Sequence, residues 1–153
     1  MKILFVCTGN TCRSVMAERL LRKMAADRGL AGWEARSAGI AAERYFAVPS
    51  GVVKALAERG ATPEGHVPQL AGREVLAWAD LVVAMTQGHR EALLEQYPEF
   101  TSRTRLFSEL AGRGEADVAD PIGQPDEVYR RCRDEIETGL DAYLRNHASQ
   151  THP

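Results

Sequence analysis

Short runs of apolar residues alternate along this chain with segments of helical periodicity, and this alternation restricts the possible folds more than any other feature. The apolar runs predict strands at 2–6, 33–37, 81–85 and 103–107. The periodic segments predict helices at 14–28, 49–60, 73–79, 87–97 and 126–146. Strands that alternate with helices are typical of parallel sheets, and right-handed crossovers place the helices on both faces. We therefore predict an α/β fold with a doubly wound four-stranded parallel sheet.

A sheet of this kind binds its ligands at the edge formed by the carboxyl ends of the strands. We therefore expect the functional site to be lined by the residues just after Val6, Ser37, Met85 and Phe107. Residues 108–125 follow the last strand and contain five glycines and prolines, which predicts a long loop at the same edge.

The length of 153 residues suits one domain, which we place at residues 1–146, followed by a polar tail at 147–153. A formal net charge of −2 gives no reason to expect nucleic acid as a partner. No apolar run approaches the roughly 20 residues of a transmembrane helix, and the apolar start of the chain ends at Val6, too early for a signal peptide. Three cysteines, an odd number, suit a reducing compartment. We expect a cytoplasmic protein without a membrane partner, and we predict no oligomeric state.

The loop between the first strand and the first helix contains Cys7, Thr8, Gly9, Asn10, Thr11, Cys12, Arg13 and Ser14. Successive backbone N–H groups in such an arc can point inward and form, with the helix N-terminus, a nest for a phosphate-sized anion. Gly9 and Asn10 are residue types that tolerate the positive φ angles of such a nest. Arg13 can bind two phosphate oxygens, and the nest favours the thiolate of Cys7, a nucleophile aimed at phosphorus. Ser14 can donate a hydrogen bond to that sulfur.

Transfer of a phosphoryl group to a thiolate requires a proton for the leaving atom, and Asp120 in the glycine-rich loop is the candidate acid. Pro121 keeps Asp120 extended, although an Asp-Pro pair often does no more than start a turn. The resulting two-step reaction passes through a cysteinyl-phosphate and requires neither a metal nor a cofactor. No metal site is suggested by the scattered histidines, which are His66, His89, His147 and His152.

The loop from 7 to 14, together with Asp120-Pro121, resembles the low-molecular-weight protein tyrosine phosphatase family. Segments 37–39 and 80–86 are similar to further segments of that family, so the resemblance covers nearly the whole chain. It implies the phosphotyrosine protein phosphatase I-like fold and phosphorylated proteins as substrates.

The resemblance also implies roles for individual residues. The catalytic residues would be Cys7, Arg13 and Asp120. The phosphate-binding loop would be supported by Asn10, Ser37 and His66. Of these, His66 is the least specific, because a histidine in a surface loop is equally common.

Thr11 and Asp120 are the candidate specificity residues. Tyrosine-specific members of the family usually carry an aliphatic residue at the position of Thr11, whereas threonine is similar to the protein-arginine phosphatase branch. A guanidinium group carries several donors, and Thr11 and Asp120 would offer it acceptors. The segment after Asp120 also lacks the aromatic residues that often flank a phenol ring in tyrosine phosphatases. We predict a phosphoarginine phosphatase, with a phosphotyrosine phosphatase of the same mechanism as the alternative.

Cys12 is either a small buried residue or the partner of Cys7 in a reversible disulfide that protects the nucleophile from over-oxidation. Cys132 lies on the apolar face of the last predicted helix and is interpreted as a core residue. An arsenate reductase would need further reactive cysteines for a disulfide relay, and only Cys132 remains for it. A non-catalytic phosphopeptide-binding module is the other alternative, and it is not expected to keep Cys7, Arg13 and Asp120 together.

Overall fold

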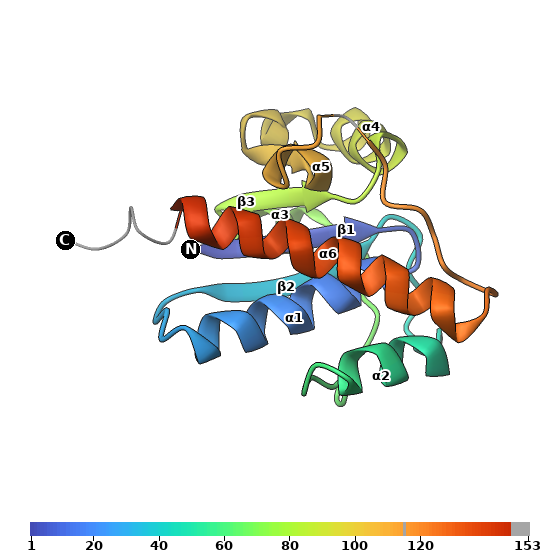
Figure 1. Ribbon diagram of the computed structural model, residues 1–153. Coiled ribbons are helices and arrows are strands. Elements are labelled where there is room, and N and C mark those ends of the chain that lie inside the picture. Colours follow the sequence, from blue (N-terminus) through green and yellow to red (C-terminus); the bar gives the residue numbers. More distant parts are fainter. Residues whose placement is uncertain (115, 148–153) are drawn as a thin grey trace.

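The computed structural model describes residues 1–114 and 116–147. Its sheet contains the parallel strands β1 (Lys2–Cys7), β2 (Glu34–Gly39), β3 (Leu81–Ala84) and β4 (Thr104–Leu106), in the spatial order β2-β1-β3-β4 (Figure 1). The helices are α1 (Arg13–Asp27), α2 (Ser50–Ala57), α3 (Arg73–Trp78), α4 (Gln87–Gln96), α5 (Phe107–Leu110) and α6 (Asp126–His147), with a 3₁₀ helix, η1 (Pro98–Arg103). This arrangement confirms the predicted α/β fold with a four-stranded parallel sheet.

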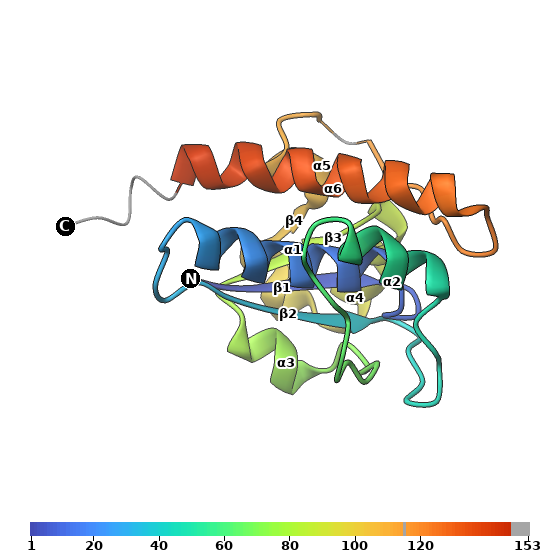
Figure 2. The ribbon, with the colours of Figure 1, turned by 60° about the horizontal axis from the view of Figure 1, so that its bottom comes forward.

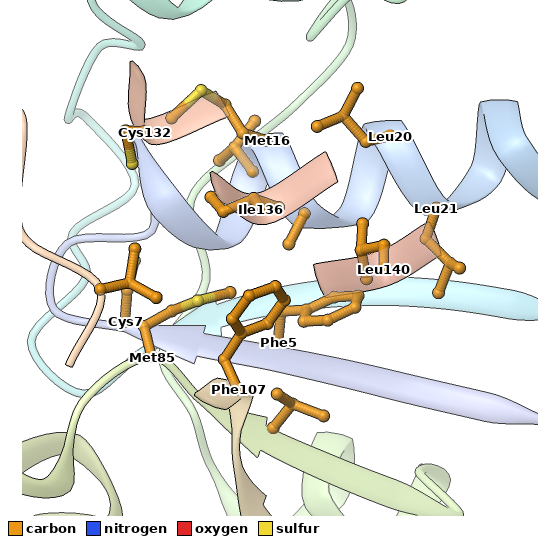
Figure 3. Close-up of a cluster of buried hydrophobic side chains, with 14 of the residues drawn as sticks. Phe5, Cys7, Met16, Leu20, Leu21, Met85, Phe107, Cys132, Ile136 and Leu140 are labelled. Atoms are coloured by element: carbon orange, nitrogen blue, oxygen red, sulfur yellow. The ribbon is translucent and has the colours of Figure 1, made fainter. Parts of the chain in front are cut away.

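Helices cover both faces of the sheet, with α1, α2 and α6 on one side and α3 and α4 on the other (Figures 1 and 2). The side chains of β1 alternate between the two cores. Ile3 and Phe5 pack toward α1 and α6, whereas Leu4 and Val6 pack toward α3 and α4. Because β1 is buried on both faces, its sequence is an uninterrupted apolar run. Cys7 continues the alternation and lies at one end of the α1–α6 core (Figure 3).

The chain changes direction across the sheet next to β1. The strand that follows β1 in sequence pairs on one side of it, and β3 pairs on the other side. Ligands bind at such a switch point, beyond the carboxyl ends of the strands. The loop from 7 to 14 leaves β1 at this point and leads directly into α1.

Two predicted boundaries near β4 are wrong. The strand ends at Leu106, and Phe107 begins α5, so residues 108–125 are not one continuous loop. The ring of Phe107 is buried against α6, where a Cβ on Gly139 would lie 2.6 Å from it. Burial of this ring against a glycine ends the strand early. Residues 98–102, for which no element was predicted, form most of η1, with proline in its first turn.

The end of the described chain also differs from the prediction. Helix α6 continues to His147, one residue beyond the predicted end of the domain. The His147 ring stacks on Tyr143 at 4.1 Å, and its Nδ1 donates to the Tyr143 carbonyl oxygen at 3.0 Å, which holds the last turn. The rest of the predicted tail, 148–153 with His152, lies outside the described residues. Within the described ranges, no helix is both long and apolar enough to cross a membrane.

Candidate active site

The backbone of the loop after β1 is shaped as an anion site. Asn10 has a φ of 59°, the only positive φ of a non-glycine residue within residues 1–114 and 116–147. Helix α1 begins at Arg13, and no side chain caps its N-terminus. The N–H groups of the first turn of a helix have no partner within that helix. The first N–H groups of α1 are therefore directed toward the loop and can donate hydrogen bonds to an anion.

Hydrogen bonds inside the loop orient the Ser14 hydroxyl as a donor to the sulfur of Cys7. The Asn10 side-chain amide donates to Ser14 Oγ at 2.9 Å, and Ser14 Oγ lies 2.9 Å from Cys7 Sγ. Because Asn10 supplies a hydrogen to Ser14 Oγ, the hydroxyl hydrogen of Ser14 remains for the sulfur of Cys7. Asn10 and Ser14 are fully buried, so this arrangement is screened from water.

A second set of contacts fixes the loop from outside. Asn10 Oδ1 accepts from the Gln69 backbone N–H at 3.0 Å, and the Asn10 carbonyl oxygen accepts from His66 Nε2 at 2.8 Å. The Gln69 side-chain amide donates to the Ser37 carbonyl oxygen, and Ser37 Oγ donates to the buried carboxylate of Glu18. Thus Asn10 and His66 act on the loop directly, whereas Ser37 acts through Gln69. The sequence offered no periodic or motif signal for Gln69 or Glu18.

The loop from 7 to 14 also rests on the end of β2. A Cβ on Gly39 would lie 2.4 Å from the Thr8 carbonyl oxygen and 2.9 Å from the Asn10 nitrogen. The Ile40 N–H donates to the Cys7 carbonyl oxygen at 2.9 Å. Only glycine permits this close approach of two backbone segments.

The segment that carries Asp120 is anchored to β3 and to Arg13. The Val118 N–H donates to the Met85 carbonyl oxygen at 3.0 Å, and the Val118 carbonyl oxygen accepts from Arg13 Nη1 at 2.9 Å. Arg13 Nη2 lies 3.5 Å from Asp120 Oδ2. The Arg13 side chain is buried and that of Asp120 is 43% exposed, so the Asp120 carboxyl group is open to the cavity that it lines. Asp120 Oδ1 accepts from the Ile122 N–H, which fixes the local turn.

These groups meet in a cavity of about 350 Å³. Its walls contain residues that the sequence predicted, namely Cys7, Thr8, Gly9, Thr11, Cys12, Arg13 and Asp120. They also contain residues that it did not predict, namely Phe46, Ala47 and Ile122. The segment after Asp120 contributes no aromatic residue, but Phe46 supplies an aromatic wall from the loop after β2. That loop has no regular periodicity, so its approach to the cavity depends on tertiary structure.

A wider cavity of about 810 Å³ is lined in part by Ser37, His66 and Gln69, the outer supports of the loop from 7 to 14. Its Arg19 and Arg22 side chains are bound to Glu18 and to backbone carbonyl oxygens. This cavity has no thiol in its walls, so we assign the chemistry to the smaller one. No group of three His, Cys, Asp or Glu side chains within the described chain is arranged to hold a metal ion.

The three cysteines are free and buried. Burial raises the pKa of Cys12 to about 11, despite the opposing hydrogen bond to the Thr11 hydroxyl. Burial also raises the pKa of Cys132 to about 12. Cys132 packs in the same core cluster as Ile136 (Figure 3), as expected of a core residue. Both thiols therefore remain protonated near neutral pH.

Comparison with known proteins identifies the family. Residues 2–151 match the family described as low molecular weight phosphotyrosine protein phosphatase. The chain is 41% identical over 140 residues to a protein-arginine-phosphatase of Geobacillus stearothermophilus, with 92% of this chain and 91% of the relative covered. It is 38% identical over 142 residues to a protein-arginine-phosphatase of Bacillus subtilis, with 90% of each chain covered.

A solved structure extends this comparison to three dimensions. An arginine phosphatase in which a serine replaces the active-site cysteine and is phosphorylated superposes with a TM-score of 0.93. The two sequences are 34% identical, and the match covers 99% of this chain and 98% of the other. The present chain therefore belongs to the low molecular weight phosphotyrosine protein phosphatase family.

Proposed function

We propose that this chain is a protein phosphatase that removes the phosphoryl group from phosphoarginine through a cysteinyl-phosphate on Cys7. The observation that carries the proposal is the cavity in which Cys7, Arg13 and Asp120 meet, with Thr11 in its wall. The protein-arginine-phosphatases among the relatives support the choice of substrate.

In the first step the Cys7 thiolate attacks phosphorus in line with the bond to the leaving nitrogen. The phosphorus–nitrogen bond breaks, and protonated Asp120 gives its proton to that nitrogen. The backbone N–H groups of the loop and the guanidinium of Arg13 bind the equatorial oxygens, where charge is held in the transition state. Arginine leaves the site, and phosphate remains bound to sulfur.

In the second step water attacks the phosphorus of the cysteinyl-phosphate. The Asp120 carboxylate accepts a proton from this water, and the sulfur–phosphorus bond breaks. The Ser14 hydroxyl, 2.9 Å from the sulfur, stabilises the departing thiolate of Cys7 by a hydrogen bond. Inorganic phosphate then leaves, and Asp120 is again protonated for the next cycle.

Thr11 supports arginine rather than tyrosine as the phosphorylated residue. A guanidinium has several N–H donors, and the hydroxyl of Thr11 and the carbonyl oxygen of the protonated Asp120 carboxyl group are acceptors in the same cavity. The aromatic wall at Phe46 does not discriminate, because a phenol ring and a planar guanidinium can both stack on it. The choice between the two substrates therefore depends on the polar groups.

The decisive experiment compares kcat/KM for phosphoarginine and phosphotyrosine peptides of the same sequence. We expect the wild type to prefer phosphoarginine and Thr11→Ile to shift the ratio toward phosphotyrosine by about tenfold or more. Thr138→Ile, an exposed position on α6, serves as the matched control and should leave the ratio unchanged. A wild type that hydrolyses phosphotyrosine better would contradict the proposed substrate but not the mechanism.

Two other functional classes make different predictions. A non-catalytic phosphopeptide-binding module would not turn over p-nitrophenyl phosphate, whereas we expect turnover that Cys7→Ser abolishes. An arsenate reductase would require a further reactive thiol after Cys7 and Cys12. Cys132 is unsuited to this relay, because its thiol is buried and burial raises its pKa to about 12.

We further propose that Cys7 and Cys12 form a reversible disulfide. Peroxide oxidises the Cys7 thiolate to a sulfenic acid, and the sulfur of Cys12 then attacks it with loss of water. The raised pKa of Cys12 supports oxidation of Cys7 first, because a protonated thiol reacts slowly with peroxide; Cys12 has to lose its proton as it attacks the sulfenic acid. Mass spectrometry after peroxide treatment should find a 7–12 crosslink, which Cys132→Ser leaves intact. Cys7 that proceeds to sulfinic acid without the crosslink would contradict this pairing.

We also propose that residues 1–146 act as one domain in the cytoplasm on phosphorylated proteins. Three unpaired thiols support a reducing compartment. Fractionation of cells that produce the protein should recover it with cytoplasmic markers. Recovery from an oxidising compartment would contradict the proposed location.

A further inference from the structure

A buried histidine of α4 contacts the phosphate loop beside the nucleophile. His89 Nε2 lies 2.8 Å from the Oγ1 atom of Thr8, the residue that follows Cys7. The backbone N–H of His89 donates to Thr86 Oγ1 at the start of α4, which fixes the position of the histidine backbone. His89 is 5% exposed, and its Nδ1 is the only buried side-chain nitrogen or oxygen without a hydrogen-bond partner in the described part of the chain.

His89 carries a single ring proton near neutral pH. Burial lowers its pKa to about 4, and the nearby charge of Arg13 acts in the same direction. Asp117 and Asp120 oppose this effect but do not outweigh it. The neutral ring has one N–H and one bare nitrogen, so the unpartnered Nδ1 is either a buried donor or a buried lone pair.

An unpartnered lone pair on His89 Nδ1 costs less free energy than an unpartnered N–H there. Buried N–H groups without acceptors are rarer in proteins than acceptors that lack a donor. The proton is therefore assigned to Nε2, and the Nε2–H of His89 donates to the hydroxyl oxygen of Thr8. The hydroxyl hydrogen of Thr8 then cannot point at the histidine and is left for another acceptor. Thr8 is exposed and lines the cavity together with Cys7 and Arg13.

We propose that His89 is a positioning residue that directs the Thr8 hydroxyl as a hydrogen-bond donor to the phosphoryl group bound over Cys7. This inference rests on the proposed role of the loop as the phosphate site. Thr8 would touch the substrate, whereas His89 would act only through Thr8. Hydrogen bonds to charged oxygens are stronger than neutral ones, so loss of this donor should lower kcat/KM by about 10-fold to 100-fold.

A double-mutant cycle with p-nitrophenyl phosphate tests the coupling. We expect Thr8→Val and His89→Leu each to lower kcat/KM by about 10-fold to 100-fold. The kcat/KM of the double variant should be no lower than that of the less active single variant. His89→Gln, whose amide can donate to the same oxygen, should retain activity within a few-fold of the wild type. Losses that multiply in the double variant, or a His89→Leu enzyme with wild-type kcat/KM, would overturn the proposal.

The dissociation constant of inorganic phosphate is measured for the same four proteins of the double-mutant cycle. This constant does not depend on turnover or on the leaving group. A wild type that hydrolyses phosphotyrosine better than phosphoarginine would therefore contradict the proposed substrate without affecting this result. The tautomer is read from the two ring ¹⁵N shifts of His89 in the labelled wild type at pH 7. We expect the proton on Nε2, and a proton on Nδ1 would overturn the assignment of the donor.

Discussion

Gly39→Ala tests how closely the fold and the chemistry are joined. The added Cβ would lie 2.4 Å from the Thr8 carbonyl oxygen, whereas ordinary contacts begin at 3.4 Å, so the two backbones must separate by about 1 Å. Strand β2 cannot easily move away, because the Gly39 N–H and carbonyl oxygen are bound to Gln69 and Ala71 at 2.9 and 2.8 Å. The loop from 7 to 14 should move instead.

A displacement of about 1 Å at a reacting centre can lower the rate by about 100-fold. We therefore expect Gly39→Ala to reduce kcat/KM for p-nitrophenyl phosphate by about 100-fold and the free energy of unfolding by about 1–3 kcal/mol. Urea denaturation shows that the variant is folded, and steady-state kinetics measures the loss. The matched control is Gly72→Ala, because a Cβ there meets no atom within 4 Å. Activity of Gly39→Ala within threefold of that control would refute the reasoning.

Three further predictions concern stability and acid catalysis. Gly51→Ala places a Cβ 2.3 Å from the Tyr129 ring, so urea denaturation should show a loss of about 1–3 kcal/mol while kcat changes little. Asp120→Asn removes the proton donor, so kcat for a phosphoarginine peptide should fall by about 10²–10⁴-fold and that for p-nitrophenyl phosphate, with its better leaving group, by less; equal losses would argue against acid catalysis. Burial and Arg13 lower the pKa of His89 from 6.5 to about 4, so the unfolded state takes up the proton first as the pH falls. The free energy of unfolding should therefore fall by about 3 kcal/mol between pH 6.5 and pH 4. His89→Gln should reduce this dependence on pH in urea denaturation, and an unchanged dependence would contradict the lowered pKa of His89.

The parts of the site that are contiguous in sequence could be predicted from it. The loop from Cys7 to Ser14 joins one strand to one helix, so local conformation alone places its backbone groups together. Asp120 was predicted because its segment follows a strand and therefore lies at the ligand-binding edge of a parallel sheet, and because Asp120-Pro121 resembles a segment of the family. The rule of the fold gives the edge, whereas the resemblance selects the residue.

The remaining residues reach the site only through tertiary packing. Gln69 and Phe46 lie in segments without periodicity, and His89 lies on a helix whose polar side chains indicate solvent rather than a buried contact. The early end of β4 depends on Phe107 packing against Gly139, a contact between residues 32 positions apart. No pattern within a short window of sequence contains this information.

The net charge of −2 gives no indication of the anion site, because the groups that form it are local and fixed by the fold. The ends of three of the four strands hold different sides of the site: β1 carries Cys7, β2 supports the loop at Gly39, and the Met85 carbonyl oxygen after β3 anchors the acid segment. Arg13 joins these parts, since one guanidinium binds the acid segment through Val118 and faces the anion site as well. Donors that are already held in place need no reorganisation when charge develops on the phosphoryl oxygens. A lysine in place of Arg13 would keep the charge but could not provide this planar fork of donors, so the fold requires arginine there.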